Sequence, residues 1–301
     1  MAGLSRFETH EVTNQSPPFE DVDLFTTDRP LQDAVRANGA EGETAALAAF
    51  GRRWGAAHMF AQAGLANSEA PRFAAFDAQG FRRDVVEYHP AYHQFMAESI
   101  GAGLHAMTWR AYGARAAAPS EVARAARCYM VAQVENGHMC PVTMTRAAVA
   151  ALAPEPALAA RLLPQIMSRS YDPSFRPWWE KSGITLGMGM TEKQGGTDVR
   201  SNTTRAVPAD DGYLVTGHKW FMSAPMCDAF LVLAQAPGGL PVSSCRASVP
   251  TAAPTACASS ASRTSSATAP TPRPRSSSPR RWRGRSAKRA GARAPSSAWC
   301  S

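Results

Sequence analysis

GMGMTEKQGGTDVRSNTTRA, residues 187–206, is the stretch of this 301-residue sequence that decides the fold. It carries few large apolar side chains, so we do not expect it to form a core element. Gly195 and Gly196 follow a Thr-Glu pair and precede a Thr-Asp pair. Glycine lets the backbone approach a ligand closely, and nearby hydroxyl and N–H groups can bind a polar ring or a phosphate. The alternative is an ordinary glycine turn between two strands, because an isolated glycine-rich signal is weak.

The hydrophobic period changes on the two sides of residue 184. Residues 31–183 show helical spacing, and Pro90 fits the first position of a helix, so we expect helices and no strand up to about residue 165. From residue 184 onward, short segments of β-forming residues alternate with turn signals such as Asp211-Gly212. The sequence therefore predicts an α+β fold. It has an arm over residues 1–30, an all-α domain over 31–183 and an incomplete β-barrel over 184–240.

The last 61 residues, 241–301, differ from the rest in composition. They contain 11 Lys and Arg, 15 Ser and no Asp, Glu, Leu, Ile, Phe or Met. Such a segment cannot bury enough apolar surface to offset its chain entropy, so we expect a disordered tail. The formal charge of +8 comes from this tail, because residues 1–240 hold 32 − 11 = 21 basic against 24 acidic residues, a net of −3.

The abrupt change after Leu240 suggests a shift of reading frame in the coding DNA. The alternative is a basic tail that evolved to bind nucleic acid through its phosphates. Back-translation of the residues that follow Leu240 can be arranged so that the other frame encodes an ordinary β-strand. We therefore favour the frame change.

The sequence also indicates a cytoplasmic protein. Its first ten residues lack the apolar core of a signal peptide, and no run of apolar residues is long enough to span a membrane. Its six cysteines form no CxxC pair or Cys/His cluster with zinc spacing, so we expect no metal site.

A resemblance to a known family sharpens the interpretation of residues 187–206. MTEKQGGTDV resembles the flavin loop of acyl-CoA dehydrogenases, in which Thr-Glu is followed by Gly-Ser/Thr-Asp. GHKWFMS, residues 217–223, resembles the Gly-x-Lys turn and strand that follow in that family. Together with VEYHPAYHQFM, CPVTMT and SNTTRA, these motifs resemble the AidB-type branch, flavoproteins of the bacterial adaptive response to DNA alkylation. The resemblance covers about residues 8–240.

The resemblance implies FAD as cofactor, bound between the β-domain and the helical domains. Carried over residue by residue, the family pattern implies three groups of cofactor-binding residues. Those beside the flavin ring are Met190 and Thr191, those near the pyrophosphate are Gly195, Gly196 and Thr197, and those behind the ring are Phe221, Met222 and Ser223. Preformed donors beside the ring would stabilise the charge that develops when the flavin accepts a hydride.

The implied activity is oxidation of a CH–CH bond in an acyl-CoA-type substrate. The family's catalytic base is a Glu of a C-terminal helical domain, so we assign no catalytic residue in this chain and expect weak FAD binding without turnover. In the full-length branch the resemblance also implies a homo-oligomer, doubtful for this chain, and possible binding of double-stranded DNA. The alternative function is a DNA-protective flavoprotein with vestigial dehydrogenase activity, although the net negative charge of residues 1–240 disfavours it.

Several other residues have both a functional and a structural interpretation. His89 and His93 lie four residues apart, but packing or capping is favoured over a metal pair. We interpret Cys128 as a small core residue and the pair at 178–179 (Trp-Trp) as core or interface. If the resemblance holds, Cys140 lines the flavin cavity. Glu192 and Asp198 have side chains that can act as acid–base groups. We expect both carboxylates to shape the loop instead.

Overall fold

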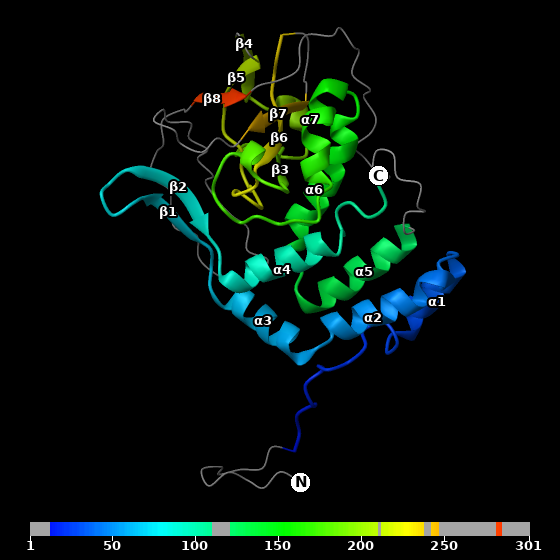
Figure 1. Cartoon of the computed structure of the whole chain (residues 1–301). Coiled ribbons are helices and arrows are strands. Elements are labelled where there is room, and N and C mark those ends of the chain that lie inside the picture. Colours follow the sequence, from blue (N-terminus) through cyan, green and yellow to red (C-terminus); the bar gives the residue numbers. More distant parts are fainter. Residues whose placement is uncertain (1–12, 110–120, 210–211, 238–241, 247–280, 285–301) are drawn as a thin grey trace.

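The structure is a computed structural model that describes residues 13–109, 121–209, 212–237, 242–246 and 281–284. The helices up to residue 134 and the strands from residue 186 onward occupy different regions of the molecule in Figure 1, whereas the helices Met139–Leu152 and Pro156–Ile166 lie beside those strands. This arrangement confirms the predicted α+β fold.

The first part of the chain forms seven helices in the described ranges. They are α1 (Arg29–Ala37), α2 (Thr44–Trp54), α3 (Ala57–Ser68), α4 (Pro90–Gly101), α5 (Glu121–Val134), α6 (Met139–Leu152) and α7 (Pro156–Ile166), with short 3₁₀ turns η1 (Glu41–Glu43), η2 (Trp178–Glu180) and, later in the chain, η3 (Val199–Ser201). The predicted helix start at Pro90 is confirmed, and the His89 side chain caps it by accepting a hydrogen bond from the Ala91 N–H at 3.2 Å. Among the described helices, none is both long and apolar enough to cross a membrane.

The prediction of no strand before residue 165 is wrong. Strands β1 (Arg72–Phe76) and β2 (Arg82–Glu87) form an antiparallel hairpin that projects from the helical part in Figure 1. Its turn is fixed by Asp77, whose carboxylate accepts hydrogen bonds from the Gln79 and Phe81 N–H groups, and by Gly80 at φ +85°. These strands could not be predicted from the hydrophobic pattern. Neither of them contains a buried residue, so the alternation of apolar and polar residues that marks a half-buried strand is absent.

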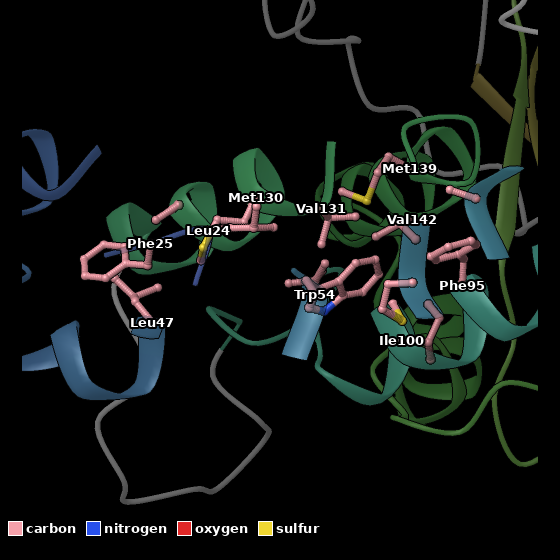
Figure 2. Packing of buried hydrophobic residues seen from close by; sticks show 14 of the residues in the cluster. Leu24, Phe25, Leu47, Trp54, Phe95, Ile100, Met130, Val131, Met139 and Val142 are labelled. Carbon is pink, nitrogen blue, oxygen red and sulfur yellow. The ribbon is translucent and has the colours of Figure 1, made fainter. Parts of the chain in front are cut away.

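The main hydrophobic core lies between α2, α3, α4, α5 and the start of α6. In Figure 2, Leu24, Phe25 and Leu47 gather with Met130 at one end, while Trp54, Phe95 and Ile100 gather near Val142 at the other. The Trp54 ring stacks on that of Phe95 with centroids 5.7 Å apart. This core fixes α4 and α6, the helices that face the β part.

The β part contains two three-stranded sheets. One has the order β3 (Leu186–Gly189), β6 (Ala229–Leu233) and β7 (Val242–Arg246), with β3 and β6 parallel and β6 and β7 antiparallel. The other is antiparallel, with the order β4 (Arg205–Ala209), β5 (Gly212–Thr216) and β8 (Arg281–Gly284). The β4–β5 pairing confirms the predicted hairpin, whose Asp211 lies outside the described residues.

Helices α6 and α7 cover one face of the β3–β6 sheet. Leu152, Leu162 and Ile166 from these helices pack against Leu186 and Leu231. In addition, the Leu186 N–H donates a hydrogen bond of 3.0 Å to the buried Thr145 hydroxyl of α6. The residues that follow β3 therefore start from a fixed position on the helical part.

The expectation of disorder after Leu240 is wrong for nine residues. Val242–Arg246 pairs with β6 as strand β7, and Arg281–Gly284 pairs with β5 as strand β8. Strand pairing uses main-chain hydrogen bonds, so a segment poor in apolar residues can still extend a sheet at its edge. The other residues of the predicted tail lie outside the described ranges.

Candidate functional site

Two glycines in β3 let the segment that precedes the MTE motif pack closely against its neighbours. A Cβ at Gly187 would lie 2.6 Å from the Phe230 ring, and one at Gly189 would lie 2.9 Å from the Met222 sulfur. Real Cβ atoms do not approach a buried ring so closely, so Gly187 requires glycine, whereas a Cβ at Gly189 would need the flexible Met222 side chain to shift. The GMGM sequence thereby places Met190 and Thr191 beside the GHKWFMS segment.

Glu192 holds the loop from the inside. Its side chain is only 2% exposed, and each carboxylate oxygen accepts three hydrogen bonds. Oε2 accepts from the Thr203 N–H at 2.7 Å, the Thr203 hydroxyl at 2.9 Å and the Gln194 amide at 2.6 Å. Oε1 accepts from the Thr204 N–H at 2.9 Å, the Thr204 hydroxyl and Lys219 Nζ at 2.8 Å.

These bonds connect one carboxylate to three places in the sequence, which are Gln194, residues 203–204 and Lys219. Burial alone would raise the pKa of Glu192, but the bonds from Lys219, Thr204 and Thr203 outweigh it and hold the pKa well below its usual range. Glu192 is therefore ionised at neutral pH, and its charge is balanced by the buried ammonium of Lys219.

The two predicted motifs meet at a main-chain hydrogen bond. The Trp220 N–H donates to the Thr191 carbonyl at 2.9 Å, and the Asn202 side chain donates to the Met190 carbonyl at 2.9 Å. The structure thus brings together Met190 and Thr191 with the segment that carries Phe221 and Met222.

The eight predicted cofactor-binding residues divide into one buried and seven accessible positions. Met222 is 3% exposed and belongs to a hydrophobic cluster of the β part, so it supports the site from below. The accessible residues are Met190, Thr191, Gly195, Gly196, Thr197, Phe221 and Ser223. Asp198 caps η3 by accepting a hydrogen bond from the Arg200 N–H at 3.2 Å, which with Glu192 confirms the loop-shaping role expected for both carboxylates.

Phe221 has an unusual backbone. Its φ is +60°, in the left-handed region that bulky residues rarely adopt, and its side chain is 40% exposed. Strained residues of this kind persist where the surroundings hold them and are found preferentially at ligand sites. The sequence contains no sign of this conformation.

The accessible residues offer apolar side chains together with hydroxyl and main-chain groups, the chemistry that the predicted FAD site requires. Met190, 41% exposed, and Phe221 offer large apolar surfaces that water covers poorly, as a flat ring would require. A Cβ at Gly195 would meet no atom within 4 Å, whereas a Cβ at Gly196 would lie 2.7 Å from the Thr191 hydroxyl. The loop is therefore open at Gly195 and tightly packed at Gly196. An open glycine lets the backbone approach a ligand closely.

The remaining candidates take structural positions. His93 Nδ1 lies 2.8 Å from the Tyr171 hydroxyl, and Cys128 packs against the main core, as expected for both. Trp178 packs on the α6–α7 cluster, while Trp179 is 52% exposed. Cys140 is exposed near the start of α6, and its place in a flavin cavity stays a prediction. Within the described ranges, no three His, Cys, Asp or Glu side chains gather as a metal site would require.

A second buried network escaped sequence reasoning. The Ser99 hydroxyl lies 2.7 Å from His138 Nε2, and His138 Nδ1 bonds the Glu135 carboxylate. Ser99 and His138 are fully buried, and the imidazole packs against the rings of both Trp54 and Phe95. This network joins α4 to the turn between α5 and α6, and its burial makes it structural.

Comparisons with known families match both parts of the chain. Residues 14–173, more than half of the chain, match the adaptive response protein AidB N-terminal domain. Residues 187–266 match the acyl-CoA dehydrogenase middle domain. A frame change after Leu240 predicts that family similarity ends there, and the match to residue 266 does not follow that expectation. The boundary and the frame change stay predictions.

Individual relatives agree with the family match. The chain is 44% identical over 236 residues to the putative acyl-CoA dehydrogenase AidB of Escherichia coli (strain K12), covering 78% of this chain and 43% of that protein. It is 40% identical over 103 residues to acyl-CoA dehydrogenase family member 11 of Caenorhabditis elegans, covering 32% of this chain and 15% of that protein. The chain thus spans less than half the length of these relatives.

Solved structures share the fold. The apo form of Bd2924 aligns with a TM-score of 0.63 at 27% identity, over 76% of this chain and 45% of that one. Caenorhabditis elegans ACDH-11 in complex with C11-CoA aligns with a TM-score of 0.61 at 24% identity, over 78% of this chain and 40% of that one. With the two motifs joined at the Thr191 carbonyl and both parts matched, this chain belongs to the AidB-like branch of the FAD-dependent acyl-CoA dehydrogenase family.

Proposed function

We propose that this chain binds FAD at the surface formed by Met190, Thr191, Gly195, Gly196, Thr197, Phe221 and Ser223, with Met222 beneath it. The observation that carries the proposal is the joint between the two motifs, where the Trp220 N–H meets the Thr191 carbonyl. Beside this joint, Met190 and Phe221 are 41% and 40% exposed. Exposed apolar side chains on a rigid, strained backbone are typical of a binding surface.

In this proposal the cofactor supplies hydride acceptance during oxidation of a CH–CH bond. The chain's own residues hold and orient it: Phe221 and Met190 exclude water from its faces, while the Thr191 and Ser223 hydroxyls donate hydrogen bonds to its edge. Donors fixed before the reaction stabilise developing charge without reorganisation. The catalytic base is not assigned to a residue of this chain. The substrate we propose is an acyl-CoA thioester, by analogy with the family.

FAD titration of the purified chain tests the proposal. We expect saturable quenching of flavin fluorescence, and the Phe221→Ala variant should weaken the Kd by roughly five- to tenfold through loss of ring contact. Phe19→Ala is the matched control, because Phe19 is 60% exposed in the segment before α1. An unchanged Kd in Phe221→Ala, or an equal loss in both variants, would contradict the proposed surface.

The substrate and the weak binding expected from the sequence need separate measurements. Anaerobic bleaching of bound flavin by any member of an acyl-CoA panel would show oxidoreductase function and contradict the expected lack of turnover, whereas an unbleached spectrum with every member is the outcome expected for this chain. Near-stoichiometric flavin in the purified sample would refute weak binding.

DNA protection is the alternative function proposed from the sequence. A mobility-shift assay of the full chain with double-stranded DNA, with and without a non-nucleic polyanion, distinguishes its two sources. Binding that the polyanion removes completely is generic attraction to the basic residues after 240. Binding that survives would favour the alternative.

We also propose that the domains follow the predicted boundaries, 31–183 and 184–240. The gap between the two matched ranges, which end at residue 173 and begin at residue 187, supports the first boundary. Limited proteolysis would place the cuts.

A further inference from the structure

A small cavity lies where the helical part meets the β part, on residues outside the proposed flavin surface. It encloses about 30 Å³ between the end of β2, α4, the loop after α7 and residues 224–227. Its polar lining comes from Tyr88, Tyr92, His93, Tyr171, Thr185 and Cys227. By this measure one water molecule needs about 10–15 Å³, so the cavity has room for about two waters or one very small polar group.

Tyr88 brings an unused hydrogen-bonding group to this cavity. Its hydroxyl oxygen is buried and has no hydrogen-bond partner among the residues that the structure describes. The ring is held in place by stacking on Tyr92, with centroids 4.4 Å apart. A buried hydroxyl without a partner is costly, so a group inside the cavity is expected to bond it.

Apart from Asp172, the polar groups that line the cavity are uncharged at neutral pH. Burial raises the pKa of Tyr88, Tyr92 and Tyr171, and it raises the pKa of the Cys227 thiol to about 12. Burial also lowers the pKa of His93, which keeps its imidazole neutral.

One ionised side chain, Asp172, also lines the cavity. Burial alone would raise its pKa, but hydrogen bonds from Ser174 and Arg176 lower it to about 2. Because the Asp172 carboxylate already accepts these bonds, it is not an open anionic group.

We propose that the cavity is a binding site for a small, neutral group that both donates and accepts hydrogen bonds, such as a primary amide. The Tyr88 hydroxyl bonds this group, and the paired His93 and Tyr171, with Nδ1 and the hydroxyl 2.8 Å apart, supply further polar lining. A carboxylate of the same size is disfavoured because the ionised Asp172 lines the cavity. An amidinium is disfavoured because the Asp172 carboxylate is already paired with Arg176 and the other polar lining groups are neutral, so the desolvation of its charge is not repaid. The site does not depend on FAD binding.

Three planar molecules of nearly equal size test this charge selectivity: formamide, formate and formamidinium. Each is titrated into the chain without FAD, and the ring signals of ¹³C-labelled tyrosine are followed by NMR. We expect formamide to shift the Tyr88 signals saturably, with a Kd no tighter than about 1 mM because it has only three heavy atoms. Formate and formamidinium should bind at least roughly tenfold more weakly, because each must shed the hydration of its charge.

The Tyr88→Phe variant tests the role of the hydroxyl. Loss of one hydrogen bond should weaken formamide binding roughly fivefold, while thermal stability is unchanged or higher because a buried polar atom is removed. Tyr129→Phe is the matched control, since Tyr129 is 52% exposed on α5. The proposal is overturned by a linear formamide titration, by equal binding of a charged probe, or by an unchanged affinity in Tyr88→Phe. The ranking of the three probes needs no variant and therefore does not depend on how a variant folds.

Discussion

Replacement of Glu192 by Gln should destabilise the loop that carries Gly195 and Gly196. The substitution keeps the size of the side chain but turns one carboxylate oxygen into an NH₂ group. Whichever way the amide is oriented, the NH₂ faces three donors, because each oxygen of Glu192 accepts three hydrogen bonds. It also removes the buried negative charge that balances the ammonium of Lys219, whose side chain is 6% exposed.

The expected cost is large for a single conservative substitution. Removing one partner of a buried ion pair typically costs ~3–5 kcal/mol, and we take about 3 kcal/mol because Gln can keep the bonds to one of the two oxygens. With an m-value of about 3 kcal/mol/M in urea, the unfolding midpoint should fall by about 1 M. Lys219→Met removes one of the donors and leaves the carboxylate its threonine partners, so its cost should be smaller.

Urea unfolding and amide hydrogen exchange measure these effects. In Glu192→Gln, exchange at the Thr203 and Thr204 amides should accelerate more than exchange in the main core. Glu98→Gln is the matched control, since the Arg53–Glu98 pair is exposed, at 62% and 25%, and such pairs contribute at most about 1 kcal/mol. A loss in Glu192→Gln no greater than in Glu98→Gln would refute the idea that this carboxylate holds the loop.

Four further outcomes are expected. Phe95→Ala, which empties a fully buried position beside Trp54, should destabilise the chain by ~3–5 kcal/mol in urea unfolding. Asp228→Asn should lower the free energy of unfolding by ~2–4 kcal/mol in the same assay, because it removes the negative charge that balances Lys181. The Lys181 Nζ lies 2.6 Å from the Asp228 carboxylate. Asp172, with its pKa lowered to about 2, contributes stability that is complete above its unfolded pKa and lost as pH falls toward 2, so Asp172→Asn should flatten the acid limb of a stability–pH profile between about pH 4 and pH 2. Sequencing of the DNA around the Leu240 codon should reveal a second frame that continues the family pattern, and an uninterrupted family-like frame through residue 301 would refute the frame change.

Most helices and strands could be predicted in their order from the sequence, and the strands that were missed have a common cause. Helical spacing and the Pro90 start were sufficient for the helices, because their apolar faces pack into the main core or against the β3–β6 sheet. The β1–β2 hairpin was missed because no residue in it is buried, so hydrophobic alternation carried no signal. Strands β7 and β8 were missed for a related reason, since edge pairing needs backbone groups rather than apolar side chains.

The candidate flavin site could be predicted in part, for a different reason. The MTE and GHK motifs were recognisable as residue types at fixed spacing, and the structure joins them at Thr191 and Trp220. The sequence could not show that Phe221 adopts φ +60°, because this conformation is imposed by neighbours and not by the residue. Nor could it show that Glu192 gathers Thr203, Thr204 and Lys219, since those contacts depend on how three separate segments pack.

The Glu192 network has a consequence for the energetics of cofactor binding. A loop that is already fixed by a buried, multiply bonded carboxylate loses little conformational entropy when a ligand arrives, so little binding free energy is spent on ordering it. The left-handed backbone of Phe221 is a second feature that the surrounding structure fixes. If this chain binds FAD weakly, the cause should therefore be missing contacts, those that the described residues do not supply, and not a disordered loop. Weakening Glu192 should then raise the Kd for FAD further, because the ordering cost would be added to the missing contacts.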